Sequence, residues 1–436
     1  MLLVFLAVLV FVMVLVVGCG YNRLGAADKT VDAPLLVITA SPSATATTVP
    51  ATPTPMPTPT AVPETEPPSP SPEPVTPAPA TDEEFLAAYV RGMSDTEKLG
   101  QLVMFGFAGD NSASAAFLDI MHEWSVGNVI LFGPNIIRID EDGGFSRCRR
   151  LTTSLQKENR SEIPLLISTD VEGGRVTRFK WPKWPTYAAT LGSNNDPEAA
   201  EKQFARIGSG LLGVGINTNL APCLDVARYP ASTFLGQRII SSKADVAASI
   251  GAACIDGLQG AGCLSIVKHF PGHGGTEVDS HEETPVVNKS FDSLSGYDLV
   301  PFQAAVDAGA DGVMVTHISY PKVDKQNIAS MSDVIIGEVL RGQMGFDGIV
   351  MSDDFRMRGL TSRYTVEKAA VRFLLAGGDL ILCGPRHDLQ KRIMTALHTA
   401  VADGSISQER LDESVTRILR AKIKYLEFNP QGAIGG

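Results

Sequence analysis

The sequence predicts an α/β protein folded as a (β/α)₈ barrel, and three observations predict it. Short apolar runs of strand length recur eight times between residues 102 and 384. Stretches with helical periodicity alternate with these runs, as expected for parallel strands joined by crossover helices. Polar and titratable residues follow the runs directly, and barrels of this kind build their active site at the carboxyl ends of the strands.

The eight predicted strands are Leu102–Phe107, Asn128–Gly133, Leu165–Asp170, Asn217–Asp225, Leu264–His269, Gly312–Ile318, Gly348–Asp353 and Asp379–Gly384. An open, doubly wound sheet is the alternative. A sheet of that kind that binds a dinucleotide carries a GxGxxG turn after its first strand, and no such turn follows Phe107. The barrel is therefore the favoured fold.

Seven stretches have helical periodicity: Asp82–Leu102, Pro197–Val214, Lys243–Gly260, Asp292–Ala308, Ser332–Met344, Tyr364–Ala376 and His387–Ala402. The first of them contains Ser94 and Glu97 in the spacing of a capping box, ahead of an apolar face.

Residues 1–19 are typical of a bacterial lipoprotein signal. Leu2 to Val17 are almost purely aliphatic, and this run is short for a bilayer span, which needs roughly 20 apolar residues. Small residues and Cys19 follow it, so we expect Cys19 to be lipidated and to become the new N-terminus. A plain membrane anchor is the alternative. Both predict an extracytoplasmic protein held at the cell membrane.

Residues 20–81 are predicted to form a disordered tether. From Ser41 to Thr81 they are mainly Pro, Thr, Ser, Ala and Glu without apolar periodicity, and such a stretch cannot bury enough surface to offset its ordering entropy. Residues 82–436 have ordinary globular composition and the size of a single catalytic barrel domain.

Charge and cysteine usage exclude some functions. The formal net charge of −11 argues against a nucleic-acid partner. Beyond Cys19, the other five cysteines are scattered without a CxxC pair, and most lie in apolar runs. We expect buried free thiols rather than a disulfide framework.

Candidate binding residues follow the third predicted strand, in the run Asp170 to Arg178 (DVEGGRVTR). The double glycine permits a tight turn that brings a carboxylate and a guanidinium together. A carboxylate accepts hydrogen bonds from sugar hydroxyls and a guanidinium donates them. A salt bridge that only pins the loop is the alternative.

The seventh predicted strand ends in two adjacent carboxylates, Asp353 and Asp354. Neighbouring residues of a strand point to opposite faces, so we expect only one of them to face the barrel mouth. A carboxylate there can act as a nucleophile, a metal ligand or a structural acceptor.

The loop after the fifth strand holds an Asp-x-His pair, Asp279 and His281. A carboxylate at this spacing can orient the imidazole and stabilise its charged form, which makes the histidine a tuned proton carrier. A metal cluster with His269 and His273 is disfavoured because Lys268 would place a cation beside the first ligand. Hydrogen bonding to loop backbone suits His273 better than His281.

The chain resembles the bacterial β-N-acetylhexosaminidases of glycoside hydrolase family 3 over residues 87–430. The motifs that carry the resemblance are Met93–Leu102, Val126–Phe132, Asp170–Arg178, Gly215–Val226, Lys268–His281 and Ser352–Asp354. The Asp-x-His insertion in Lys268–His281 separates this branch from the β-glucosidases of the family. The resemblance implies a barrel without the second, sandwich domain of many relatives.

The resemblance also implies roles. Asp353 would be the catalytic nucleophile of a retaining reaction with a covalent glycosyl-enzyme, and His281 the acid/base with Asp279 as its partner. The N-acetylglucosamine unit would be held by Asp170, Arg178, Arg238, Lys268 and His269. Lys268 would keep Asp353 ionised if the two lie close, and neither a metal nor a cofactor is expected.

The implied substrate is a non-reducing-end β-linked N-acetylglucosamine of peptidoglycan fragments, processed by a monomer that contacts the membrane through its lipid anchor. One alternative is an N-acetylglucosaminide phosphorylase, because a neutral histidine base would not repel phosphate as a carboxylate would. The other is a sugar-binding lipoprotein without activity.

Overall fold

The computed structural model describes residues 82–431 except 110–111, 137–143, 181–182, 184 and 230–232. The chain divides into two units, residues 1–75 and 76–436, and all described residues belong to the second. The predicted signal, Cys19 and the tether lie outside the described residues. Among the described helices, none combines the length and the apolar character needed to cross a membrane.

Eight parallel strands form one sheet in the order β7-β6-β5-β4-β3-β2-β1-β8. The strands are β1 Val103–Gly106, β2 Asn128–Ile130, β3 Leu166–Thr169, β4 Thr218–Asn219, β5 Leu264–Phe270, β6 Gly312–Val315, β7 Ile349–Ser352 and β8 Ile381–Cys383. A parallel bridge between Met351 and Leu380 brings the two ends of this order together, so the sheet closes into a barrel. The predicted fold class is confirmed, and every predicted strand overlaps an observed one. The fourth is much shorter than predicted, because only Thr218–Asn219 of Asn217–Asp225 is a strand.

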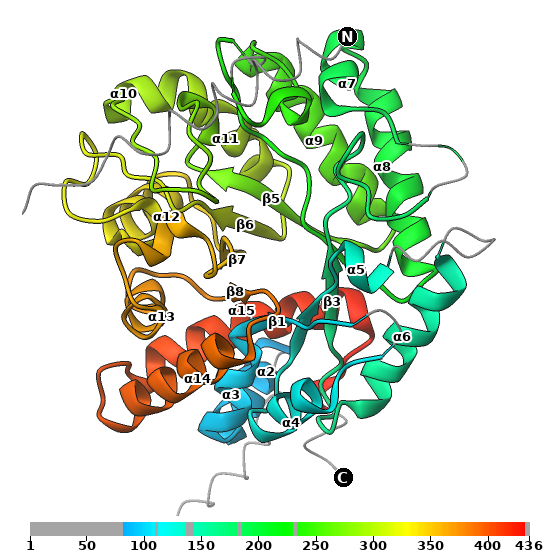
Figure 1. Ribbon diagram of the computed structural model, residues 1–436, viewed down its shortest axis with the longest axis vertical. Coiled ribbons are helices and arrows are strands. Elements are labelled where there is room, and N and C mark those ends of the chain that lie inside the picture. Colours follow the sequence, from blue (N-terminus) through cyan, green and yellow to red (C-terminus); the bar gives the residue numbers. More distant parts are fainter. Residues whose placement is uncertain are drawn as a thin grey trace, which may run out of the picture. The chain divides into compact units, whose positions relative to one another are not determined.

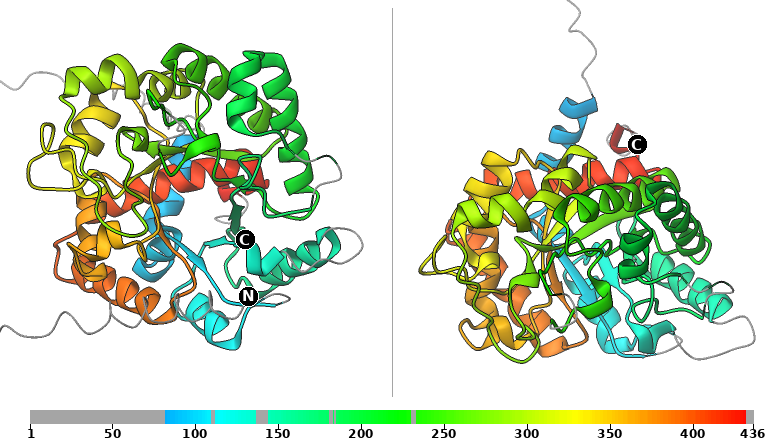
Figure 2. Two further views of the ribbon diagram at one scale, coloured as in Figure 1. Left: turned by 45° about the horizontal axis from the view of Figure 1, so that its top comes forward. Right: turned by 90° about the horizontal axis from the view of Figure 1, so that it is seen from above.

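The helices surround the strands (Figure 1). The longer ones are α2 Asp82–Gly92, α3 Asp95–Gln101, α4 Ala115–Glu123, α6 Phe145–Glu158, α7 Ala188–Asn194, α8 Pro197–Leu212, α9 Ala244–Gly260, α11 Val300–Asp307, α13 Val366–Leu375, α14 His387–Ala402 and α15 Gln408–Leu426. Short elements are α5 Gly133–Ile136, α10 Phe291–Ser293, α12 Arg358–Thr361 and the 3₁₀ turns η2 Gly236–Arg238, η3 His273–Gly275 and η5 Ala329–Met331. The first and last described helices, α2 and α15, lie side by side (Figure 2), where Arg420 pairs with Glu83.

Three predicted helices differ from the structure. Asp82–Leu102 is two helices, because Ser94 caps a new one. The Ser94 side chain accepts from the Glu97 amide, and the Glu97 carboxylate accepts from the Ser94 amide. The stretch Asp292–Ala308 is broken by a π-helical turn, η4 Leu294–Asp298, ahead of α11. The stretch predicted at Ser332–Met344 is π-helical over Val334–Gln343 (η6).

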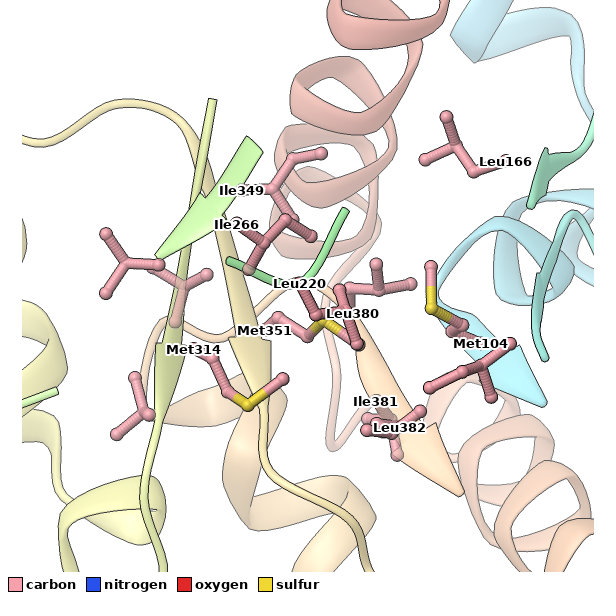
Figure 3. Close-up of a cluster of buried hydrophobic side chains, with 14 of the residues drawn as sticks. Met104, Leu166, Leu220, Ile266, Met314, Ile349, Met351, Leu380, Ile381 and Leu382 are labelled. Carbon is pink, nitrogen blue, oxygen red and sulfur yellow. The ribbon is translucent and has the colours of Figure 1, made fainter. Parts of the chain in front are cut away.

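The barrel interior is filled by apolar side chains from the strands and the segments beside them (Figure 3). Figure 3 labels Met104, Leu166, Leu220, Ile266, Met314, Ile349, Met351, Leu380, Ile381 and Leu382. All of them are buried. A filled interior leaves the ends of the strands as the place for a polar site. The five described cysteines are buried free thiols, as predicted.

Candidate active site

A cavity of about 370 Å³ lies beyond the carboxyl ends of the strands. Its apolar floor consists of Ile130, Leu220, Met314 and Leu382, and two aromatic side chains, Phe132 and Phe234, also line it. Seven of the eight predicted catalytic and binding residues line this cavity: Asp170, Arg178, Arg238, Lys268, His269, His281 and Asp353. The eighth, Asp279, reaches the site through its contact with His281.

Lys268 joins the loop after β3 to the end of β5. Its Nζ lies 2.7 Å from Asp170 Oδ1 and 2.7 Å from Glu172 Oε1, and its side chain is 3% exposed. Arg178 donates to the other Asp170 oxygen at 2.9 Å. Burial alone would raise the pKa of Asp170, but the charges of Lys268 and Arg178 hold it well below its usual value. Asp170 is therefore an anion with two cationic neighbours at the cavity wall.

Glu172 also lines the cavity, although it was not among the predicted site residues. It accepts two hydrogen bonds from Arg238, from Nε at 2.7 Å and from Nη2 at 2.9 Å. Burial would raise its pKa, but Arg238 and Lys268 outweigh burial and lower the pKa of Glu172 to about 2. Its position two residues after Asp170 in a glycine-rich turn was the signal that could have found it. Glu172 fixes two of the predicted sugar-binding cations at once.

The double glycine of this loop is required by the packing. Gly173 and Gly174 have φ angles of 102° and 55°. A Cβ on Gly174 would lie 2.0 Å from the Tyr187 ring, and one on Gly173 would lie 2.2 Å from the Thr186 carbonyl oxygen. Only glycine fits both positions without displacing the loop that carries Arg178.

Asp225 organises the other side of the cavity. Its Oδ2 lies 2.6 Å from His269 Nδ1, and its Oδ1 accepts the backbone amide of His273 at 2.5 Å. Burial would raise its pKa, but the two histidines hold the pKa of Asp225 well below its usual value. Asp225 thus orients His269 and anchors the start of the loop that leads to His281.

Cys223, Asp225 and His269 are the described residues whose donor atoms are close enough together to hold a metal ion. These atoms already bond to one another: the Cys223 thiol donates to Asp225 Oδ2 at 3.2 Å, and His269 Nδ1 contacts the same oxygen. Burial raises the pKa of the Cys223 thiol well above its ordinary value, which favours the protonated form over the thiolate that binds metals. The group therefore fits a hydrogen-bonded network better than a metal centre.

Asp353 follows β7 at the cavity. Burial alone would raise its pKa, but the charges of His269 and His317 and the Asp354 amide, which donates to Asp353 Oδ1 at 2.8 Å, lower the pKa of this carboxyl. Lys268, which we expected to keep it ionised, instead pairs with Asp170 and Glu172.

Asp354 corrects a second expectation. It also lines the cavity, because both carboxylates lie past the end of β7, where strand alternation no longer applies. Asp354 is bound by the Arg356 guanidinium, with the shortest contact at 2.6 Å. Of the two neighbouring carboxylates, Asp354 is therefore paired with a cation. Asp353 has no cationic side chain bonded to it in the described part of the chain.

Asp279 and His281 form a pair at the rim of the cavity. His281 Nδ1 and the His281 amide lie 2.7 and 2.9 Å from the same oxygen, Asp279 Oδ1. Burial would raise the pKa of Asp279, but the His281 amide and ring hold it below its usual value. The His281 side chain is 66% exposed, so it can exchange protons with water. His273 behaves differently from the prediction: its ring binds the Ser280 hydroxyl rather than loop backbone.

Comparisons with known proteins identify the family of the chain. The sequence matches the N-terminal domain of glycosyl hydrolase family 3 over residues 95–421. It is 29% identical to "Beta-hexosaminidase A" of Pseudoalteromonas piscicida, covering 78% of this chain and 63% of that protein. It is 36% identical to a beta-hexosaminidase of Tolumonas auensis, covering 61% of this chain and 77% of that protein.

Solved structures give the same result. The fold is similar to that of a family 3 β-N-acetylglucosaminidase from a Paenibacillus species, with a TM-score of 0.73 and 37% sequence identity, covering 77% of this chain and 63% of that one. The chain therefore spans less than two thirds of the Pseudoalteromonas and Paenibacillus proteins. Since the matched residues 95–421 include all eight strands of the barrel and most of the chain, this protein belongs to glycosyl hydrolase family 3.

Proposed function

We propose that this protein is a retaining exo-β-N-acetylhexosaminidase that removes β-linked N-acetylglucosamine from the non-reducing end of its substrate. The observation that carries the proposal is that one cavity is bordered by a carboxylate, Asp353, and by a histidine, His281, whose ring is held by Asp279. Membership of the family and the β-hexosaminidases among its relatives support the choice of sugar.

In the first step, Asp353 attacks the anomeric carbon as the bond from that carbon to the leaving oxygen breaks. The imidazolium of His281 gives its proton to the leaving oxygen, which departs as an alcohol. The product is a covalent glycosyl-enzyme on Asp353, and His281 is now neutral. The lowered pKa of Asp353 keeps its carboxylate ionised and ready to attack near neutral pH.

In the second step, neutral His281 takes a proton from water as the water oxygen attacks the anomeric carbon. The bond to Asp353 breaks, and the sugar leaves with its original anomeric configuration. Imidazole can donate a proton in the first step and accept one in the second, which suits a single side chain that acts as acid and then as base. Asp279 fixes which ring nitrogen faces the substrate, because it holds Nδ1 and leaves Nε2 to exchange the proton.

The cavity supports removal of single sugar units. Its volume of about 370 Å³ is at the small end of the range for ligand cavities. Asp170 and Glu172 supply acceptors for sugar hydroxyls, while Lys268, Arg178 and Arg238 supply donors. The apolar floor suits the non-polar parts of a sugar ring and an acetamido methyl group.

We further propose that the substrate is a peptidoglycan fragment and that the enzyme acts as a monomer outside the cytoplasm, held at the membrane through a lipid on Cys19. The pattern of residues 1–19 and the Pro- and Thr-rich composition that follows support this location. Mass spectrometry of the mature N-terminal peptide from the native host tests it: a diacylglyceryl group on Cys19 is expected, and an unmodified or uncleaved N-terminus contradicts the lipid anchor.

The activity is tested with an aryl N-acetyl-β-glucosaminide. The wild-type protein should release the aryl alcohol, while Asp353→Ala should lose nearly all turnover and His281→Ala should lose about 10²- to 10⁴-fold. Near-wild-type turnover in either variant would contradict the assignment. Phosphate buffer gives a further outcome, because N-acetylglucosamine 1-phosphate as the product identifies a phosphorylase. A peptidoglycan fragment, a chitin oligomer and a glycoprotein glycan compared at equal concentration test the substrate class.

A further inference from the structure

Ser280 lies between Asp279 and His281, yet it is buried whereas Asp279 is half-buried and His281 is exposed. Ser280 is 1% exposed, whereas the side chains of Asp279 and His281 are 32% and 66% exposed. Buried polar groups in folded proteins are almost always hydrogen-bonded, so a buried serine at this point must have partners. The structure shows two partners, and each belongs to a different part of the barrel.

The first partner is His273, at the start of the same loop. Its Nε2 lies 2.8 Å from the Ser280 hydroxyl oxygen. Its other ring nitrogen, Nδ1, is buried and has no hydrogen-bond partner among the described residues, and burial lowers the pKa of His273 to about 4. The neutral tautomer with the proton on Nε2 leaves no buried N–H unpaired, so the ring donates to Ser280. His273 is itself anchored by its amide to Asp225.

The second partner is Gly359 in α12, a few residues beyond Asp353. Its backbone amide donates to the Ser280 carbonyl oxygen at 2.9 Å. Thr284 makes a further contact with this segment: its hydroxyl donates to the Gly359 carbonyl oxygen at 2.8 Å. A Cβ at residue 359 would lie 2.9 Å from the Ser280 carbonyl oxygen, so the contact leaves no room for a side chain. The loop of the candidate acid/base therefore rests on the segment that follows the candidate nucleophile.

We propose that Ser280 is a positioning residue for His281, an inference that rests on the function proposed above. Its hydroxyl is hydrogen-bonded to His273 and its carbonyl oxygen to the Gly359 amide. These two hydrogen bonds, called the clasp below, fix the loop and with it the imidazole relative to Asp353. Ser280 lines the cavity, but its hydroxyl is bound to His273, so its proposed role is to hold His281 and not to act on the reacting atoms. Its loss leaves binding of the sugar intact and misplaces the proton donor.

Two variants break the clasp from opposite sides. Ser280→Ala removes the hydroxyl that binds His273, and Gly359→Ala pushes against the Ser280 carbonyl oxygen at 2.9 Å and the His317 carbonyl oxygen at 3.0 Å. Ser414→Ala is the matched control: Ser414 is also a serine that is 1% exposed, and its hydroxyl donates to Asp379 at 2.7 Å. The control therefore loses one buried serine hydroxyl and its hydrogen bonds, to Asp379 and, at 3.4 Å, to the Gly378 carbonyl oxygen, without touching the loop.

The kinetic readout uses two aryl N-acetylglucosaminides. Misplacement of a catalytic group by about 1 Å can reduce the rate by about 10²-fold, so kcat of Ser280→Ala with the phenyl substrate should fall about 10- to 100-fold, with KM changed by less than about twofold. Nitrophenolate leaves without help from an acid, whereas phenolate needs a proton. The loss of bond-cleavage rate, measured in the pre-steady state, should therefore be several-fold smaller with the nitrophenyl substrate. Gly359→Ala should behave likewise, and Ser414→Ala should match the wild type.

Deuterium exchange tests the clasp without any substrate. Amide exchange in peptides covering residues 276–284 should rise in Ser280→Ala and Gly359→Ala but not in Ser414→Ala. Unchanged exchange there, or an equal loss of cleavage rate with both leaving groups, overturns the proposal. Failure of the wild-type protein to cleave either substrate contradicts the proposed function alone, and the exchange result then still decides whether the clasp exists.

Discussion

Glu172→Gln tests whether the buried ion network holds the binding site together. Glu172 is 3% exposed and accepts from Arg238 at 2.7 and 2.9 Å, and Lys268 lies 2.7 Å from it. Glutamine keeps the size of the side chain but removes its charge, and its amide N–H₂ replaces one acceptor oxygen. Arg238 and Lys268 then lose the negative charge of Glu172 at a buried position.

The expected cost is about 3 kcal/mol of the free energy of unfolding at pH 7. Breaking a buried pair by removing one partner typically costs about 3–5 kcal/mol. The lower end of this range is expected because Lys268 retains its ion pair with Asp170 and because the Arg238 side chain is 25% exposed to water. The pKa gives a similar magnitude: a value of about 2 against an ordinary 4.5 corresponds to about 3 kcal/mol at neutral pH.

The loss should depend on pH in a defined direction. The folded pKa of Glu172 lies below its unfolded value, so its stabilisation is present above about pH 4.5 and is lost as the pH falls towards about 2. The stability difference between the wild-type protein and Glu172→Gln should therefore shrink over that range. Urea unfolding at pH 7 and at steps down to pH 3 measures it, and the KM for an aryl substrate should rise because Arg238 and Lys268 are no longer fixed.

Glu367→Gln is the matched control. Glu367 also binds an arginine through two hydrogen bonds, from Arg392 at 2.6 and 3.1 Å, and this pairing lowers its pKa to about 2 as well. Its side chain is 37% exposed and that of Arg392 is 49% exposed, so water and salt screen the pair and the cost should stay below about 1 kcal/mol. Equal costs for the two substitutions would refute the reasoning that burial gives the Glu172 pair its strength.

Three further outcomes are expected. Asp279→Asn should lower kcat about 10- to 100-fold with little change in KM, because a neutral amide stabilises the imidazolium less, and steady-state kinetics over pH 5–8 checks it. Lys422 is buried and donates to Gln101 and the Gly127 carbonyl, and burial holds its pKa well below 10.5. The free energy of unfolding of the wild-type protein should therefore rise relative to that of Lys422→Met by up to about 1.4 kcal/mol per pH unit from pH 7 to 9, as measured by urea unfolding. Gly174→Ala should lower the melting temperature and raise KM, because the new methyl group meets the Tyr187 ring; an unchanged KM would mean that the loop does not position the sugar-binding groups.

Much of the barrel could be predicted from sequence because its strands are short apolar runs followed by polar residues. The strand that ends before Asp170 and the strand that ends before Asp353 are examples. The breaks in the helices were harder to predict. Ser94 is visible as a helix cap, but the π-helical turns at Leu294–Asp298 and Val334–Gln343 leave no comparable local signal, since helix type there depends on packing against neighbours.

The site was predictable at the level of residue types and not at the level of partners. The Asp-x-His spacing placed Asp279 against His281 because two residues of separation suffice for that contact. Contacts across the barrel mouth have no such local signal. Glu172 lies 66 residues from Arg238 in the chain, and the pairing of Ser280 with Gly359 depends on two loops meeting in space.

The most direct test of the central claim is to trap the glycosyl-enzyme. His281→Ala is mixed with an N-acetylglucosaminide that bears a good leaving group, the reaction is quenched with acid, and the peptides are analysed by mass spectrometry. Without its base the variant should hydrolyse the intermediate slowly, so the peptide that contains Asp353 should be heavier by one N-acetylglucosaminyl group. A label on any other residue, or release of the aryl alcohol in a burst without any labelled peptide, would contradict the assignment of Asp353 as the nucleophile.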